Sequence, residues 1–242
     1  TSPLGRSQLA LFPESQMEEM GAAAFVDMQA QQSVDASPQN NAYVQCVSKA
    51  VTDALPESSS WEVVVFDDDS ANAFALPGGK IGVHTGLLTV ATNQDQLATV
   101  IGHEVAHVLA RHANERVSTN YVASTGLQLI QVAAGEPTAA KQKLFSLLGI
   151  GAQVGVLLPF SRTQESEADL LGLDLMARAG FDPRASIPLW QNMSAAGGDA
   201  PPEFLSTHPS HDTRIGDLSK RLQVAMPLYE EAKRAGKRPR CG

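Results

Sequence analysis

Residues 93–113 read NQDQLATVIGHEVAHVLARHA, and this stretch has the clearest helical pattern of the chain. Its apolar residues recur three and four positions apart, the spacing of a helix face that packs into a core. At its start, Asn93 followed by Gln96 has the form of a helix N-terminal cap with its partner three residues later. The stretch therefore predicts a buried helix that runs from Asn93 to about Ala113.

Three ionisable residues interrupt this apolar helix. His103 and His107 lie four residues apart, so on a helix their imidazoles project from one face and can reach one Zn²⁺ at about 2.0–2.1 Å. Glu104 is directed to the edge of that site, where it can take a proton from an attacking water and later deliver it to a leaving amine. The alternative is a helix with two ordinary histidines, although burial of these groups is costly unless something satisfies them. The pattern predicts a zinc site with Glu104 as the catalytic base.

A third zinc ligand is predicted in the sequence ESEAD, residues 165–169, near the start of a helix predicted from Arg162 to Ala179. On that helix Glu165 and Asp169 share a face, whereas Glu167 points roughly opposite. A Glu can bind zinc, and an Asp one turn later can accept the proton of the second ring nitrogen of a ligand histidine. The alternative is the acidic, solvated start of an ordinary helix.

The other elements are shorter. Residues 61–66, 72–76 and 80–85 have strand composition, and the last two flank Pro77-Gly78-Gly79, a strong hairpin signal. They predict a small antiparallel sheet of three or four strands between helices. A loop is predicted over residues 194–202, which are rich in Gly, Ala and Pro. Further helices are predicted from Ser15 onward, over 38–55, from Pro209 or Ser210 to about Val224, and over 228–235.

The composition fits one sizeable domain with short appendages, because 43% of the 242 residues are hydrophobic and 18% are charged. The net charge of −8 argues against a nucleic-acid-binding protein. The predicted parts are an N-terminal arm, a main domain, and a C-terminal helix with a basic tail, over residues 1–13, 14–225 and 226–242. That basic tail is either solvated or in contact with an anionic lipid or a partner.

Two stretches carry no charge, Val117 to Gly135 and Leu144 to Ser161. The first is too polar for a membrane span, and Gly149, Gly151 and Pro159 interrupt the second. Both are interpreted as buried or cleft-lining helices, with contact to a membrane surface as the alternative.

The chain has two cysteines, Cys46 and Cys241. Neither lies in a metal-binding spacing, and the second is next to the last residue, where an unpaired thiol would be exposed. A disulfide between them is the hypothesis, which implies an oxidising compartment. Two free thiols are the alternative.

Three motifs occur in order: HEVAH at 103–107, SRTQESEADLLG at 161–172 and THPSHDTR at 207–214. Together they resemble the HtpX and CAAX-prenyl-protease type family of zinc metallopeptidases (gluzincins), and within it the soluble periplasmic lipoproteins of bacteria. The resemblance implies an α+β fold, a mostly helical gluzincin domain with a small antiparallel β-sheet that borders the active-site cleft. It also implies one Zn²⁺ per chain, with Glu165 as the third ligand and Asp169 as the residue that orients a ligand histidine.

The resemblance assigns roles to the third motif and to one strand as well. His208 is implied to approach the zinc, either as a fourth ligand in a latent state or as a stabiliser of the developing oxyanion. Its alternative is a histidine at a helix start. Arg214 matches a family arginine near the same loop. His84, His112 and His211 are interpreted as incidental. Extended substrate is implied to add as a further strand to an edge strand formed by Lys80, Ile81, Gly82 and Val83.

The implied function is zinc-dependent hydrolysis of peptide bonds in unfolded or misfolded cell-envelope proteins. The implied location is the periplasm, with a lipid anchor outside this sequence that tethers the protein to the outer membrane. Possible partners besides polypeptide substrates are envelope chaperones or assembly machinery. No transmembrane hairpin is predicted between His107 and Glu165, which argues against intramembrane or prenyl-protein substrates. The alternatives are a binding protein whose zinc site is blocked by His208, and a zinc hydrolase of non-peptide substrates. Sites of this type also accept divalent ions other than zinc.

Overall fold

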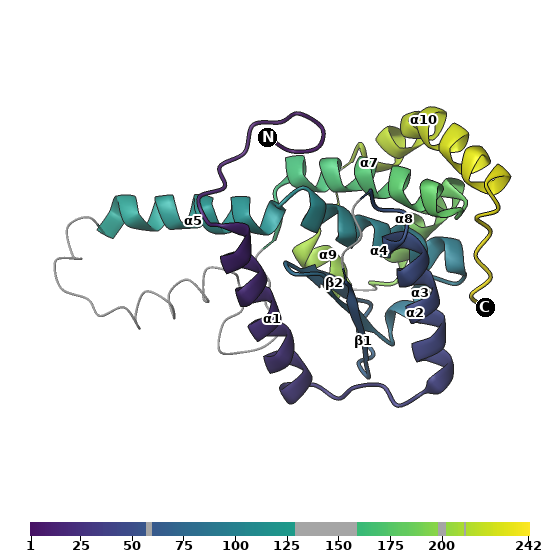
Figure 1. Ribbon diagram of the computed structural model, residues 1–242, viewed down its shortest axis with the longest axis horizontal. Coiled ribbons are helices and arrows are strands. Elements are labelled where there is room, and N and C mark those ends of the chain that lie inside the picture. Colours follow the sequence, from purple (N-terminus) through teal and green to yellow (C-terminus); the bar gives the residue numbers. More distant parts are fainter. Residues whose placement is uncertain (57–59, 129–158, 198–201, 211) are drawn as a thin grey trace.

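The computed structural model describes residues 1–56, 60–128, 159–197, 202–210 and 212–242. Helix α4 (Gln94–Leu109) lies at the centre of the molecule, with α7 (Arg162–Ala179) on one side and a small sheet on the other (Figure 1). Such an arrangement of helices around a small sheet confirms the predicted mostly helical α+β class.

Two glycines let α4 and α7 approach each other backbone to backbone. A Cβ atom on Gly102 would lie 2.8 Å from the carbonyl oxygen of Gly172, and one on Gly172 would lie 2.7 Å from the amide nitrogen of His103. A larger residue at either position would push the helices apart. This close crossing brings the histidine-bearing face of α4 against the acidic face of α7.

Local signals set the start of α4 and both ends of α7. The Asn93 side chain accepts a hydrogen bond from the Gln96 amide at the start of α4. Ser161 and Gln164 form a reciprocal capping box at the start of α7, and Gly180 ends it in the left-handed conformation. The prediction that the helix from Asn93 continues to about Ala113 is wrong, because α4 ends at Leu109.

The chain turns sharply after α4. Arg111 has a φ of +54°, and α5 (His112–Gln128) begins directly after it. A residue with this φ cannot continue a right-handed helix, so α5 leaves in a new direction.

The sheet has three strands in the order β1-β3-β2: β1 (Glu62–Phe66), β3 (Lys80–His84) and β2 (Ala73–Leu76). The predicted hairpin is present, since β2 and β3 pair antiparallel across a turn in which Gly78 and Gly79 both have positive φ. However, β1 and β3 are parallel. The expectation of an all-antiparallel sheet is wrong because the chain after β1 crosses to the far side of β3 before it forms β2.

The remaining helices surround this centre. Helix α10 is one continuous helix through Pro227, whereas the sequence predicted two helices with a break. Its buried side chains Leu218, Ala225 and Ala232 lie on both sides of the proline, and packing against α7 holds the helix together. The helices not yet given are α1 (Glu14–Gln31), α2 (Pro38–Thr52), α3 (Leu87–Val90), the 3₁₀ turn η1 (Pro183–Ala185), α8 (Ser186–Ala195), α9 (Glu203–Thr207) and α10 (Arg214–Arg234).

Both ends of the chain lie against helices. A disulfide joins Cys46 of α2 to Cys241, which are 195 positions apart, with a Cα–Cα distance of 5.5 Å. The N-terminal arm, residues 1–13, contains no helix or strand, and it crosses α5 (Figure 1). Of the two uncharged stretches, 129–135 and 144–158 lie outside the described residues. None of the helices in the described ranges has the length and apolar character needed to cross a membrane.

Candidate metal centre

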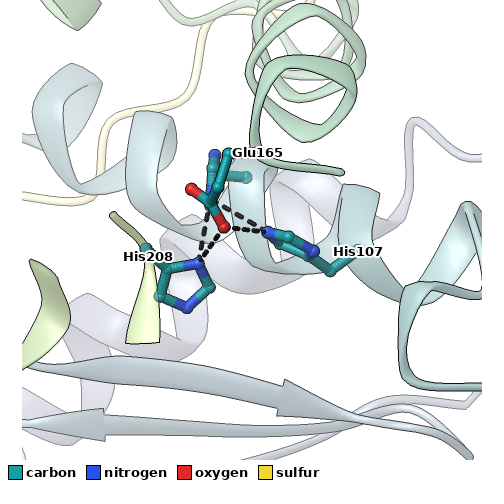
Figure 2. A group of neighbouring side chains, drawn as sticks. His107, Glu165 and His208 are labelled. Carbon is teal, nitrogen blue, oxygen red and sulfur yellow. Dashed lines mark hydrogen bonds and ion pairs between the residues drawn. The ribbon is translucent and has the colours of Figure 1, made fainter. Parts of the chain in front are cut away.

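Four potential metal ligands converge in the core. His103 and His107 come from α4, Glu165 from α7, and His208 from the residue that follows α9. All four are buried, and one donor atom of each lies within 4.8 Å of the others. Figure 2 shows the Glu165 carboxylate between the imidazoles of His107 and His208. This group can hold a metal ion.

The distances between the donor atoms fit a tetrahedral ion. His103 Nε2 lies 3.1 Å from His107 Nε2 and 3.2 Å from His208 Nδ1. Glu165 Oε1 lies 3.3 Å from His107 Nε2 and 2.9 Å from His208 Nδ1. Ligands at about 2.0–2.1 Å from a tetrahedral Zn²⁺ are about 3.3–3.4 Å apart, close to these values. The set of imidazoles and one carboxylate suits zinc and several other divalent ions.

The electrostatics of the cluster also favour a cation. Burial acts to lower the pKa of His103, but the carboxylates of Glu165 and Asp169 raise it to about 10. Burial lowers the pKa of His107 well below its ordinary value. In the absence of a metal, a proton on His103 therefore balances the carboxylates, and a divalent ion would displace it.

Asp169 and Arg214 contact the candidate ligands His103 and Glu165. Asp169 Oδ1 lies 3.0 Å from His103 Nδ1, the ring nitrogen that faces away from the cluster. Arg214 donates to Asp169 Oδ2 at 2.7 Å and to Glu165 Oε2 at 2.6 Å, and its guanidinium lies over the Trp190 ring at 4.0 Å. Arg214 is 1% exposed, so it is a buried cation shared by two carboxylates.

Glu104 lies between the cluster and the sheet. Its Oε2 accepts a hydrogen bond from the Ala75 amide of β2 at 3.2 Å, and its Oε1 lies 3.2 Å from His208 Nε2. Burial raises the pKa of Glu104. A carboxylate with a raised pKa beside a metal site suits a general base.

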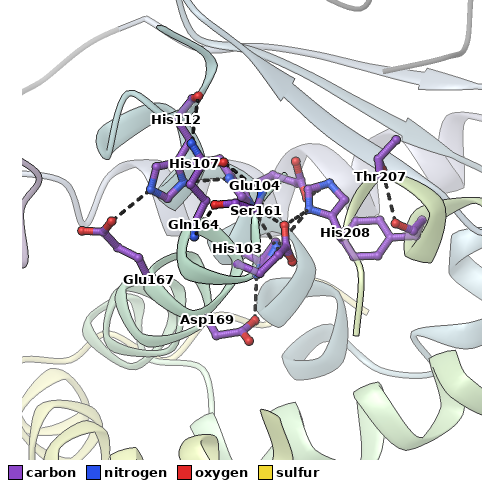
Figure 3. A network of polar contacts seen from close by, with 12 residues as sticks. His103, Glu104, His107, His112, Ser161, Gln164, Glu167, Asp169, Thr207 and His208 are labelled. Carbon is purple, nitrogen blue, oxygen red and sulfur yellow. Dashed lines mark hydrogen bonds and ion pairs between the residues drawn. The ribbon is translucent and has the colours of Figure 1, made fainter. Parts of the chain in front are cut away.

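The sequence analysis missed the contacts of two buried residues beside the cluster. His112, interpreted as incidental, has its Nδ1 2.9 Å from His107 Nδ1 and its Nε2 3.1 Å from Glu167 Oε2 (Figure 3). On a continuous helix, His112 would lie on a different face from His107, and only the turn at Arg111 folds it back. Glu167 does face away from Glu165, as predicted, but toward His112. His211 lies outside the described residues.

The predicted substrate strand is wrong. Lys80, Ile81, Gly82 and Val83 lie in β3, which pairs with β1 on one side and β2 on the other. The backbone hydrogen-bonding groups of β3 are therefore already engaged on both sides, and it is not an edge strand. The edge strand beside the cluster is β2. Its residues line a pocket together with cluster residues: Phe74, Ala75, Leu76, Glu104, His107 and His208.

Comparisons with known proteins identify the type of domain. A family model described as Peptidase family M48 matches residues 38–222. The mitochondrial metalloendopeptidase OMA1 of Arabidopsis thaliana is 40% identical over 178 residues, which cover 72% of this chain and 35% of that protein. The OMA1 of Saccharomyces cerevisiae is 38% identical over 197 residues, covering 76% of this chain and 53% of that protein.

A bacterial relative matches the same part of the chain. The beta-barrel assembly-enhancing protease of Escherichia coli is 29% identical over 191 residues, covering 76% of this chain and 39% of that protein. The chain thus spans about a third to a half of the length of these relatives. The predicted location in the periplasm at the outer membrane is contradicted, because relatives from plant, yeasts and mammals are named mitochondrial.

Proposed function

Because the chain belongs to peptidase family M48, we propose that it is a zinc endopeptidase that hydrolyses peptide bonds in unfolded or misfolded polypeptides. The observation that carries this proposal is the buried tetrahedral group of His103, His107, Glu165 and His208 with Glu104 beside it. The cell envelope is no longer expected to be the source of the substrates, because relatives of this chain are named mitochondrial. Binding to assembly machinery stays a prediction for this chain. The word "assembly" occurs in the name of the E. coli relative.

In this proposal, His103, His107 and Glu165 hold the metal, and Asp169 fixes the orientation of His103 by accepting its Nδ1 hydrogen. A bound zinc ion would supply a Lewis acid that activates water toward a peptide carbonyl. Glu104 takes the proton from that water. Its Oε2 is engaged by the Ala75 amide and its Oε1 lies 3.2 Å from His208 Nε2, so Oε1 accepts the proton once His208 has moved away and afterwards delivers it to the leaving amine.

We propose that the substrate lies along β2. Backbone groups alternate in direction along a strand, and the Ala75 amide points to Glu104, away from β3. This edge of β2 therefore faces the cluster. An extended polypeptide added there would place a peptide bond near Glu104, and its side chains would enter the pocket beside Phe74 and Leu76.

The proposal is tested by metal analysis combined with digestion of an unfolded protein such as casein. One zinc ion per chain is expected, and removal of the metal with a chelator should abolish cleavage. Addition of one equivalent of zinc should restore it, because the ligands are preformed in the fold. Cleavage that persists in fully metal-free protein would contradict the proposal.

His208 closes the site in this structure. Its Nδ1 takes the fourth corner of the donor group, where a catalytic zinc site keeps an open position for water. Its ring stacks on Phe204, with ring centroids 4.3 Å apart, and it is 1% exposed. We therefore propose that this arrangement is latent and that His208 withdraws before water and substrate enter.

Replacement of His208 by alanine is expected to raise casein cleavage about tenfold or more, because the open member of such an equilibrium is commonly populated at about 0.1–10%. The measurement is kcat with zinc-loaded protein. His84→Ala is the matched control, since His84 is also a buried histidine, at the end of β3, and its Nδ1 contacts Ser70. It should leave the rate unchanged.

The opposite result has a defined meaning. A fall in kcat for His208→Ala would contradict latency and show that His208 stabilises the transition state. If the wild type and His208→Ala both bind zinc but neither cleaves casein, the result would favour the second candidate function, that of a binding protein. The observation that favours this alternative is the occupied fourth corner.

A further inference from the structure

A line of contacts runs outward from the metal centre to the N-terminal arm. His107 Nδ1 lies 2.9 Å from His112 Nδ1, and His112 Nε2 lies 3.1 Å from Glu167 Oε2. The same Glu167 oxygen accepts a hydrogen bond from Arg6 Nε at 2.9 Å. Figure 3 shows His112 between His107 and Glu167. His112 and Glu167 are both buried, so the contact between these two side chains is shielded from water.

The positions of the hydrogen atoms along this line follow from its inner end. His107 presents Nε2 to the donor group, so its hydrogen is on Nδ1 and is donated outward. His112 Nδ1 must then accept it, which places the hydrogen of His112 on Nε2, where it is donated to Glu167. One ring orientation and one tautomer are thereby selected for each histidine.

Arg6 anchors the outer end. Besides Glu167, it donates to both carboxylate oxygens of Glu115 on α5, at 2.5 and 2.7 Å. Further hydrogen bonds hold the arm, from Gln8 Nε2 to the carbonyl of Ala110 at the end of α4, at 2.6 Å, and from the Leu11 amide to Ser118 Oγ of α5, at 2.9 Å. The position of Arg6 is therefore set by the fold.

We propose that His112 and Glu167 are positioning residues for the metal ligand His107, and that the N-terminal arm, through Arg6, is part of the metal centre. The inference rests on the proposed metal site. Asp169 positions His103 through its Nδ1, and the His112–Glu167 pair performs the same task for His107. The arm thus supports metal binding although it lies outside the region that the family model matches, residues 38–222.

The test compares the zinc affinity of full-length variants by competition with a chromophoric chelator. Loss of such an orienting partner commonly weakens metal binding about 10–100-fold, and this is expected for Glu167→Ala and His112→Ala. Asp174→Ala is the matched control, because Asp174 also lies on α7 and also pairs with an arginine, Arg221 of α10, but makes no part of the line from Arg6 to His107. It should bind zinc within about threefold of the wild type. Arg6→Ala should weaken binding, by less than Glu167→Ala.

Asparagine at position 112 separates positioning from simple packing. His112→Asn keeps an oxygen near the place of Nδ1, which can accept the His107 hydrogen, but it cannot reach Glu167. Its zinc affinity should lie between those of His112→Ala and the wild type. Circular dichroism and thermal melting of the metal-free proteins show whether each variant folds. If His112→Ala does not fold, the comparison of His112→Asn and Glu167→Ala with the wild type tests the inference.

The outcomes separate this inference from the proposed function. Equal zinc affinity for Glu167→Ala and Asp174→Ala would overturn the role of the His112–Glu167 pair. Wild-type affinity for Arg6→Ala would overturn the role of the arm. If either of these results is found while the wild type binds zinc and cleaves casein, the proposed function stands. A wild type that binds no zinc would remove the proposed function and this inference together.

Discussion

Replacement of Glu104 by glutamine is expected to lower kcat for casein cleavage by a factor of about 10²–10⁴ while the protein keeps its zinc. Glutamine has nearly the same shape and can still accept the Ala75 amide hydrogen bond. It cannot take a proton from water. The rate should therefore fall through loss of proton transfer, with the fold and the metal ligands unchanged. Single-turnover digestion and metal analysis of the same sample measure both quantities.

Glu203→Gln is the matched control for this prediction, since Glu203 of α9 is a carboxylate near the sheet whose Oε1 contacts Asn72 Nδ2 at 3.3 Å. Its rate should stay close to that of the wild type. A Glu104→Gln protein that retains more than about a tenth of the wild-type rate would contradict the role of Glu104 as general base. A variant without zinc would make Glu104 part of the metal site and not the base.

Replacement of Arg214 by methionine is expected to lower the free energy of unfolding by about 3–5 kcal/mol, because removal of one partner leaves buried charges without compensation. Arg214 is 1% exposed and binds Glu165 and Asp169 at once. Methionine fills the space over Trp190 without the charge. The loss should be larger in metal-free protein, where the two carboxylates have fewer cations beside them. Urea unfolding of both forms measures it.

Arg221→Met is the matched control for Arg214→Met. Arg221 also lies on α10 and also pairs with a carboxylate of α7, Asp174, but its side chain is 25% exposed. Water screens such a pair, so a loss of about 1 kcal/mol or less is expected. Equal destabilisation by the two substitutions would show that the Arg214 cluster has no special weight in the stability of the fold.

The sequence predicts those elements whose signals are local. The Asn93 cap specifies the start of α4, and the capping box at Ser161 and the terminal Gly180 specify both ends of α7, where the structure places them. The central place of β3 depends on which way the chain crosses after Phe66, and no local pattern encodes that choice. The antiparallel sheet and the edge-strand role of β3 were therefore predicted incorrectly.

The same distinction applies to the candidate site. Helical spacing is enough to bring His103 and His107 to one point and to select Glu165 and Asp169 on one face of α7. The position of His112 depends on a turn at Arg111, which has a positive φ. No glycine or proline in the sequence indicates a turn at this residue. From the sequence alone, the helix is expected to continue through Arg111, and His112 is then expected to point away from the ligands.

The disulfide between Cys46 and Cys241 closes the chain between these two residues into a covalent ring, and the residues before Cys46 extend from it as a linear segment. A single cut inside the ring leaves both fragments covalently joined, so a nicked molecule still migrates as one species until a reductant is added. A cut between Gln31 and Cys46 instead releases a peptide that carries the arm and α1. Self-digestion within the catalytic part would therefore be invisible on a non-reducing gel, whereas loss of the arm would be visible and irreversible.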